Sequence, residues 1–295
     1  MTIETIDLHF KGISQTIASY LIVGADGPVL VETGPGSTTH NLVSGLAEHG
    51  FVPSDVKHVL VTHIHFDHAG AAGWWAQQGA HIYAHHFGAK HLIDPSKLIA
   101  SATRIYGDEM DTLWGKILPI PSEQLTPLYD GDTVEAAGLT FEVIETPGHA
   151  RHHHIYRLGD IAFTGDATAV LIPSANLTDL PAPPPEFDRE AWLNTLDRIE
   201  AENFTAIYPT HFGRIDDVKA HLDSIRPLLT AAPNFVKARM DDGLSRDEIV
   251  LAYREWNKER AETAGLTAVQ VAQYAAANPQ DMSVDGIMRY WHKRS

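Results

Sequence analysis

Residues 62–70, THIHFDHAG, are the feature that most constrains this chain, because they bring four metal-ligating side chains together directly after a short apolar segment. That segment, residues 56–62, has the composition of a buried strand. His63 and His65 are two residues apart, so in an extended loop they can point the same way and bind one metal ion. Asp67 and His68 follow them and can turn toward a second ion. The pattern predicts a metal-binding loop held rigidly at the end of a strand.

Three further ligand-type residues stand in the same position relative to predicted strands. His149 lies in ETPGHA, Asp166 in FTGDA and His211 in YPTHFG, each just after a strand. One histidine alone is more often a packing residue than a ligand, but seven such residues in this arrangement indicate one site along one rim of a sheet structure. The chain has no Cys, so any metal must be held by nitrogen and oxygen ligands. Two divalent transition-metal ions are expected, with zinc first and iron or manganese as alternatives.

Strands and helices alternate through the first 215 residues, which indicates the α/β class. The helix predicted at 37–48 has Ser37 as its N-cap, and a second is predicted at 69–78. A Pro-rich extended loop is expected at 181–187. The strands are expected at residues 16–23, 28–32, 56–62, 80–84, 134–146, 152–165 and 205–210.

Two segments depart from this alternation. Residues 87–126 are semi-apolar and helical, and we expect an insertion that walls a pocket. The sequence from about residue 216 is helical throughout, with capping boxes at Ser245 and Glu248 and at Thr267 and Gln270. We therefore predict a main domain over residues 1–225 and a helical C-terminal appendage over 226–295. All seven candidate ligands precede residue 216, so the appendage is not expected to contribute to the metal site.

In content, order and spacing, these ligand segments resemble the motifs of the metallo-β-lactamase superfamily over roughly residues 15–215. The resemblance implies a four-layer αβ/βα sandwich. It also implies that His63, His65 and His149 bind metal one, that Asp67, His68 and His211 bind metal two, and that Asp166 bridges the two ions. The helical tail is similar to the arrangement in glyoxalase II-type enzymes and in the quinolone-signal response thioesterase.

One position departs from the superfamily pattern. The early Asp-Thr-Gly of many members is Glu32-Thr33-Gly34 here. We interpret Glu32 as a residue that does not bind metal itself but orients a residue that does.

Other histidines and aromatic residues are expected to be structural. Strand alternation should point His153 away from His152 and His154, and none of the three is predicted to be a ligand. Trp74 and Trp75 are expected in the core. A further set is assigned to local structure, the pocket rim or ordinary packing, and it comprises His81, His85, His86, His91, Phe66, Tyr106, Trp114, Tyr129 and Phe212.

The predicted site suits hydrolysis of a carbonyl substrate. Two divalent ions bring four positive charges, while Asp67, Asp166 and a metal-bridging hydroxide bring three negative ones, so the centre carries about +1 and favours an oxyanion. Asp67 and Asp166 are the expected catalytic residues, and Asp166 could steer the hydroxide's proton to the leaving group. No Ser or Cys nucleophile is needed.

The charge of the whole chain narrows the substrate class. With 22 basic and 38 acidic residues, the net charge of −16 disfavours nucleic acid and anionic membranes as partners. No export signal is seen, which favours a cytoplasmic enzyme over a secreted β-lactamase. A small ester, thioester or lactone remains as substrate. The alternatives are a mononuclear iron oxidoreductase similar to persulfide dioxygenases, and a binding or signalling protein with incidental hydrolysis. The sequence makes no prediction of oligomeric state.

Overall fold

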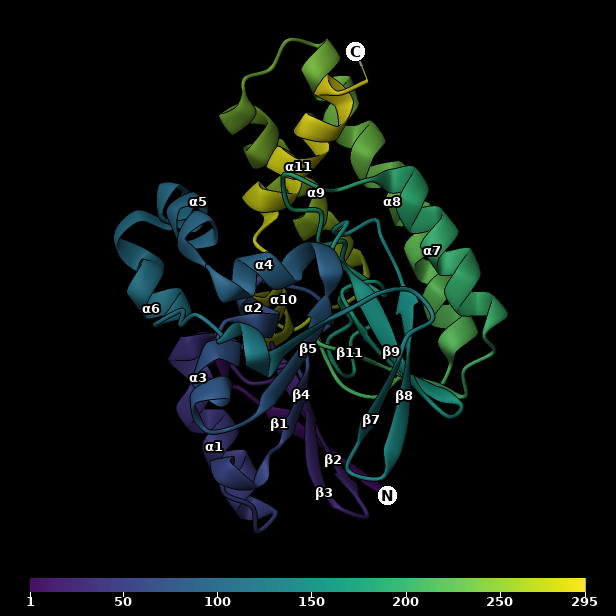
Figure 1. Cartoon of the computed structure of the whole chain (residues 1–295). Coiled ribbons are helices and arrows are strands. Elements are labelled where there is room, and N and C mark those ends of the chain that lie inside the picture. The colour runs from purple at the N-terminus through teal and green to yellow at the C-terminus, as the bar shows by residue number, and fades with distance from the viewer. Residues whose placement is uncertain (295) are drawn as a thin grey trace.

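The computed structural model describes residues 1–294 as two β-sheets packed face to face, with helices on both outer faces (Figure 1). Apolar side chains fill three layers of contact. One cluster joins the first sheet to the N-terminal helices, a second lies between the sheets, and a third joins the second sheet to the C-terminal helices. The predicted four-layer αβ/βα sandwich with a helical C-terminal region is therefore confirmed.

The first sheet has the strand order β1-β2-β3-β4-β5-β6, which is the order in the chain. The first three strands are antiparallel, and β3 to β6 are parallel. The sequence patterns did not predict β1 or β6, which are the two edge strands. The strands are β1 (Thr2–Asp7), β2 (Ala18–Gly24), β3 (Gly27–Val31), β4 (His58–Leu60), β5 (His81–His85) and β6 (Leu125–Leu128).

The second sheet has the order β11-β10-β9-β8-β7, with only the β10–β11 pair parallel. The predicted hairpins at 134–146 and 152–165 are both present, but the first strand of the second hairpin begins at His154, two residues later than predicted. The C-terminal end of β4, the loop after β8, the end of β10 and the end of β11 meet at one rim, so their loops can share a site. The strands are β7 (Thr133–Ala136), β8 (Leu139–Glu145), β9 (His154–Leu158), β10 (Ile161–Gly165) and β11 (Ala206–Pro209).

The first sheet is covered by α1 (Thr39–Glu48), α2 (Phe66–Ala69) and α3 (Ala72–Gln77). The helix predicted at 69–78 is present as α3 but begins later, because Gly70 and Ala71 form a turn after α2. The predicted insertion forms α4 (His86–Ile93), α5 (Ser96–Tyr106) and α6 (Met110–Trp114), and α5 and α6 project to one side of the sandwich (Figure 1). Short 3-10 helices lie at Phe10–Gly12, Gly36–Thr38, Pro53–Asp55, Gly107–Glu109 and Ser122–Gln124.

The second sheet is covered by α7 (Arg189–Ala201) and α8 (Val218–Asp241), which are followed by α9 (Arg246–Thr263), α10 (Ala268–Ala277) and α11 (Gln280–His292). Both predicted capping boxes are present, at the starts of α9 and α10. The predicted domain boundary at 225/226 falls inside the continuous helix α8. The appendage thus begins as an extension of a helix that already covers the sheet.

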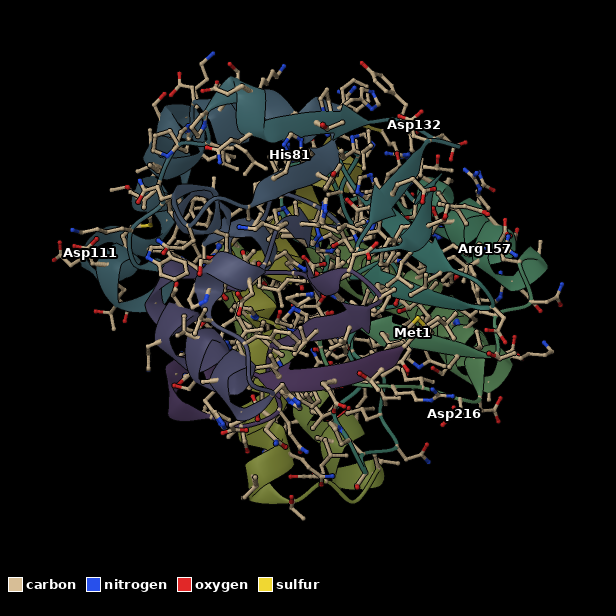
Figure 2. All side chains as sticks on the ribbon, turned by 60° about the horizontal axis from the view of Figure 1, so that its bottom comes forward. Met1, His81, Asp111, Asp132, Arg157 and Asp216 are labelled. Carbon is tan, nitrogen blue, oxygen red and sulfur yellow. The ribbon has the colours of Figure 1, made fainter. Side chains whose placement is uncertain are left out.

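Charged residues lie on the outside of this arrangement. Asp111 and Asp216, for example, lie at the periphery of the molecule in Figure 2, and both are exposed. Among residues 1–294, no helix combines the length and the apolar composition needed to cross a membrane.

The tail is expected to contribute to global stability, because α11 buries Val284 and Ile287 completely in the cluster that contains Trp192 of α7. We predict that Ile287→Ala lowers the free energy of unfolding by about 2–5 kcal/mol, since it leaves a cavity in a packed core. Chemical denaturation followed by circular dichroism measures this. Val269→Ala, at a side chain that is 65% exposed on α10, is the matched control and should change stability little. Equal effects of the two substitutions would show that α11 is not part of the core.

Candidate metal centre

The three histidines predicted for metal one converge on a common point. His65 Nδ1 lies 2.9 Å from His63 Nε2 and 3.0 Å from His149 Nε2. Their ligand atoms all lie within 4.8 Å of one another, which suits a single ion between them. His63 and His149 are buried, and His65 is partly exposed beside the cavity described below.

Asp67, His68 and His211 form a second group within the same 4.8 Å limit. His211 Nε2 lies 3.5 Å from Asp67 Oδ2, and His68 Nε2 lies 3.8 Å from the same oxygen. The extended loop expected for all four motif residues is wrong in one respect, because Asp67 and His68 lie on the single helical turn α2. His65, directly before the turn, is extended, and the turn brings the next two side chains round to the second group.

Asp166 lies between the two groups and faces both. Its Oδ2 is 3.3 Å from His149 Nε2, while its Oδ1 is 3.3 Å from His68 Nε2 and 3.6 Å from His211 Nε2. Each carboxylate oxygen therefore faces a different histidine group. This is the arrangement expected of a bridging ligand.

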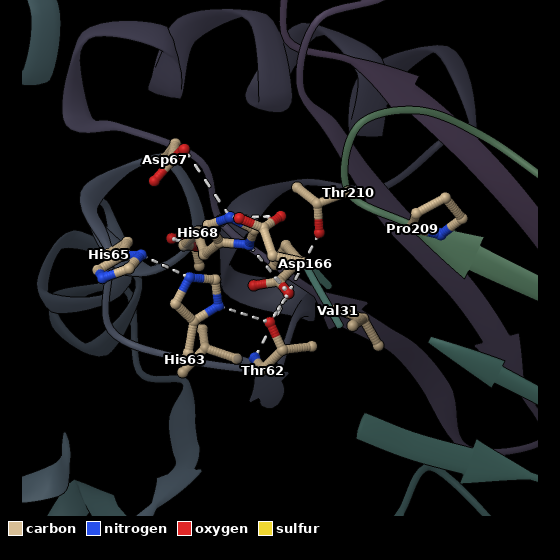
Figure 3. Close-up of polar contacts among 12 residues, drawn as sticks. Val31, Thr62, His63, His65, Asp67, His68, Asp166, Pro209 and Thr210 are labelled. Carbon is tan, nitrogen blue, oxygen red and sulfur yellow. Dashed lines mark hydrogen bonds and ion pairs between the residues drawn. The ribbon is translucent and has the colours of Figure 1, made fainter. Parts of the chain in front are cut away.

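Backbone carbonyl and hydroxyl groups fix which nitrogen faces the centre in three of the histidines, and Figure 3 shows the contact between Thr62 and His63. The Nδ1 of His149 is 2.8 Å from Pro181 O, and the Nδ1 of His211 is 2.6 Å from Thr16 O. Because a carbonyl can only accept, each Nδ1 carries the proton and each Nε2 presents a lone pair to the centre. Thr62 Oγ1 performs the same role for His63, at 3.1 Å.

Glu32 lies beneath this network, on the side away from the cavity. Its Oε1 accepts a hydrogen bond from Thr62 Oγ1 and lies 3.4 Å from His68 Nδ1. Thr210 Oγ1 is 3.4 Å from the same oxygen (Figure 3). Glu32 therefore contacts His68 directly and reaches His63 through Thr62, so a single carboxylate connects one ligand from each group.

Two backbone features hold the ligand loops in place. The amides of Thr33 and Gly34 both donate to the carbonyl of His68, at 2.8 and 3.1 Å, which fixes the end of α2. Gly165, directly before Asp166, has φ of 51°, and a Cβ there would lie 2.4 Å from Thr62 Oγ1 and 2.7 Å from His153 Nε2. A glycine is therefore required at residue 165 for β10 to approach the motif loop.

The tail supports two of these histidine anchors. Ser283 Oγ donates to Leu180 O and accepts from Ala182 N, so it brackets Pro181, the acceptor for His149. Gln273 Nε2 of α10 donates to Ser14 O, two residues before the acceptor for His211. The tail provides no ligand, as expected, but the expectation that it does not contribute to the metal site is wrong, because its side chains hold the loops that orient two ligands.

The pKa shifts divide the centre into neutral histidines and ionised carboxylates. Burial and the neighbouring histidines hold the pKa of His63 well below its usual value and lower that of His65 to about 3. These rings are neutral and offer lone pairs. Burial raises the pKa of Asp67, but His68 and His211 outweigh it and lower that pKa to about 2. The pKa of Asp166 lies well below its usual value for the same reason.

Buried polar atoms without partners indicate, independently of the family resemblance, that these ligands could bind metal ions. Four buried polar atoms at the centre lack a hydrogen-bond partner within the described residues. They are both ring nitrogens of His68, Asp166 Oδ1 and Glu32 Oε2. Such atoms are costly to bury unless something binds them, and a cation would satisfy the two that face the ligand groups, His68 Nε2 and Asp166 Oδ1.

The His152–His154 run is placed differently from the prediction. Strand β9 begins only at His154, so alternation does not govern the two residues before it, and His153 is not turned away from the site. Its Nε2 accepts a hydrogen bond from Asp166 N at 3.1 Å, and its ring centroid lies 4.8 Å from that of His63. No metal-binding group among the described residues includes any of the three. His153 is a supporting residue that the sequence reasoning missed, and the run of histidines itself was the signal.

A cavity of about 260 Å³ opens directly above the ligands. Asp67, Asp166 and His152 contribute to its floor. Phe66, Tyr106 and Trp114 line its walls, whereas Tyr129 and Phe212 do not. Further wall residues come from the N-terminal segment, the insertion, the Pro-rich loop, the end of α10 and the start of α11, and include Phe10, Leu98, Ala102, Leu113, Pro183, Ala276 and Met282.

Comparison with known proteins identifies the family. The sequence profile of the metallo-beta-lactamase superfamily matches residues 15–211, so the chain belongs to this superfamily. A metallo-beta-lactamase family protein from Thermus thermophilus has the same fold, with a TM-score of 0.71 and 22% identity over 99% of this chain and 93% of that one.

Two curated relatives align over parts of their sequences. The metallo-beta-lactamase fold-containing protein of Sulfurisphaera tokodaii is 25% identical over 61% of this chain and 66% of that protein. The atrochrysone carboxyl ACP thioesterase of Aspergillus fumigatus is 23% identical over 70% of this chain but only 39% of the fungal protein. The chain therefore spans less than two thirds of the length of these relatives.

We predict that the purified protein binds close to two transition-metal ions per chain, because two histidine groups share Asp166. Elemental analysis of protein produced in metal-replete cells measures this. A stable content of one ion under excess metal would contradict the two-group interpretation.

Asp67→Ala should empty the second group alone, because Asp67 is part of that group and not of the first. The expected metal content is close to one ion per chain, with an unchanged circular dichroism spectrum. Asp108→Ala, which removes an exposed carboxylate from the insertion, is the control for lost charge. Retention of both ions by Asp67→Ala would show that the residue is misassigned.

Glu32→Gln should weaken metal binding by roughly 10- to 100-fold, the usual effect of removing a hydrogen-bonded partner of a metal ligand. The reason is the loss of the negative charge 3.4 Å from His68 Nδ1. Competition with a chromophoric chelator measures the affinity, with Glu109→Gln on the surface as control. An affinity equal to that of the control would assign Glu32 to folding alone.

Proposed function

We propose that the protein is a dinuclear metal-dependent hydrolase acting on a small ester, thioester or lactone. The observation that carries the proposal is the position of Asp166, whose two oxygens face two separate histidine groups. The buried orphan atoms His68 Nε2 and Asp166 Oδ1 support the presence of a cation at the second group. Zinc is the first choice of metal on ligand chemistry, since neutral imidazoles and carboxylates suit it well.

Each ligand residue has a defined part in this proposal. His63, His65 and His149 would hold the first ion, Asp67, His68 and His211 the second, and Asp166 both. When bound, such ions supply Lewis-acid chemistry that activates water and polarises a carbonyl group. Asp67 and Asp166 reach the cavity floor, so their carboxylates are the protein's available groups for holding or moving a proton beside the reacting carbonyl.

The cavity favours an apolar acyl group. Its walls are dominated by aliphatic, aromatic and proline side chains, and its polar residues are the ligands at the floor together with Lys11, Ser101 and Asn278. An apolar chain or ring can therefore be desolvated against the walls with its carbonyl over the floor. The names of two curated relatives, a thioesterase and a hydroxyacylglutathione hydrolase, support an ester-type bond as the target.

The decisive experiment is a panel of acyl thioesters, aryl esters and lactones, assayed with and without a chelator. We expect hydrolysis of at least one class, its loss on chelation and its return with added zinc. Oxygen uptake with a persulfide substrate is measured in parallel. Oxygen uptake without hydrolysis, at one iron per chain, would replace the proposal with the oxidoreductase alternative.

Filling the cavity should restrict the acyl group. We predict that Ala276→Phe, on the tail side, and Ala102→Phe, on the insertion side, each raise the KM for long acyl substrates more than for acetyl substrates, because the new ring occupies part of the cavity. Ala268→Phe, at an exposed position of the same tail helix, is the matched control. If both cavity variants fold and still handle long and short chains as the control does, the acyl group does not occupy this cavity.

A further inference from the structure

A second hollow lies beside the metal centre, with a volume of about 360 Å³. It is formed by the loop that precedes and follows His149, by the loop leading into α7, and by the last turns of α11. Pro185 lines both this hollow and the apolar cavity, so the two adjoin across one residue. The lining residues are Pro147, Gly148, Arg151, Pro185, Glu186, Asp188, Ala191, Arg289 and Lys293.

Three cationic residues from distant parts of the chain line this hollow, which we call the basic groove. Arg151, Arg289 and Lys293 are all exposed, and within residues 1–294 none has a carboxylate within 4.0 Å of its charged nitrogens. The guanidinium of Arg151 lies over the ring of Phe87 at 4.2 Å. Lys293 Nζ donates to Pro185 O at 3.0 Å, which leaves two of its three protons available.

The two acids of the basic groove are already engaged. Glu186 Oε2 accepts from the Arg151 amide at 3.2 Å and lies 3.5 Å from His152 Nε2. Asp188 accepts from the Ala191 amide at the start of α7 and pairs with Arg294 at 3.3 Å. The groove therefore keeps unpaired positive charge on a chain whose net charge is −16.

We propose that the basic groove binds the phosphate groups of the substrate's leaving group, so that the substrate is an apolar acyl thioester of a soluble phosphorylated thiol. Arginine binds phosphate bidentately, and Arg289 and Lys293, one turn apart at the end of α11, with Arg151 across the hollow, match a group with more than one negative charge. The acyl chain would occupy the apolar cavity, and the thiol arm would cross Pro185 into the groove. In the reaction, oxygen from water bonds to the acyl carbon, the carbon–sulfur bond breaks, and the thiol leaves with a proton.

The inference relies on the proposed function for the position of the scissile bond, but the groove is tested by binding alone. The probe is desulfo-coenzyme A, which has the phosphates and no thiol that could bind metal. Calorimetry on the full-length, metal-loaded protein measures its dissociation constant. We expect Arg289→Ala/Lys293→Ala to raise this constant roughly tenfold, and added salt to weaken binding to the wild type. Arg254→Ala/Lys258→Ala, which removes the same charge from the exposed face of α9, should change nothing.

A kinetic comparison then assigns the bound phosphates to the leaving group. The same acyl group is presented as a thioester of coenzyme A and of neutral N-acetylcysteamine. We expect the wild type to have a higher kcat/KM for the coenzyme A thioester. The Arg289→Ala/Lys293→Ala protein should lose this preference. Equal desulfo-coenzyme A affinity in the groove and control variants would overturn the proposal. Hydrolysis confined to thioesters on a carrier protein, with soluble thioesters inert, would also overturn it. If no thioester is hydrolysed but the binding difference is found, the proposed function fails while the groove stands as a phosphate site.

Discussion

The convergence of five imidazoles and three carboxyl groups in a buried space is the constraint on which the rest of the structure depends. Groups that present lone pairs to one another repel, and burial removes the water that would otherwise separate them. The protein tolerates this because each contributing loop is fixed independently. His149 is tied to Pro181, His211 to Thr16, and His63 to Thr62. The unfavourable energy of bringing these groups together is opposed by contacts at several β-strand ends, and packing of the two sheets already fixes those ends in place.

The helical tail is connected to this constraint and is not an independent addition. Its side chains Ser283 and Gln273 hold the loops whose carbonyls orient His149 and His211, and Gly286 packs so closely on Ala182 that a Cβ would lie 1.9 Å from its carbonyl oxygen. The same helices form one wall of the apolar cavity. Substrate selection and ligand orientation therefore share one set of contacts, which explains physically why a tail without ligands belongs to the site.

Much of the site could be predicted from the sequence, because strand ends and ligand types are local signals. His63, His65 and Asp166 each follow an apolar strand, and the Gly before Asp166 marks a close approach of backbone. What failed depended on tertiary context. Edge strands β1 and β6 lack the apolar run of central strands, and the bend between α2 and α3 has no Pro to mark it. The role of His153 depended on where β9 begins, which neither composition nor alternation determines.

The carboxyl groups explain why Glu32 replaces a shorter acid without disrupting the centre. Glu32 lies in the left-handed region, with φ of 67°, and its backbone is held by Leu60 O and by the hydroxyl of Ser19. Its longer side chain reaches both Thr62 and His68 with one oxygen and leaves the other without a partner. With Asp67 and Asp166 it brings three carboxyl groups to the centre, beside five imidazoles. This concentration of acids is the charge distribution that the proposed pair of divalent ions would complement.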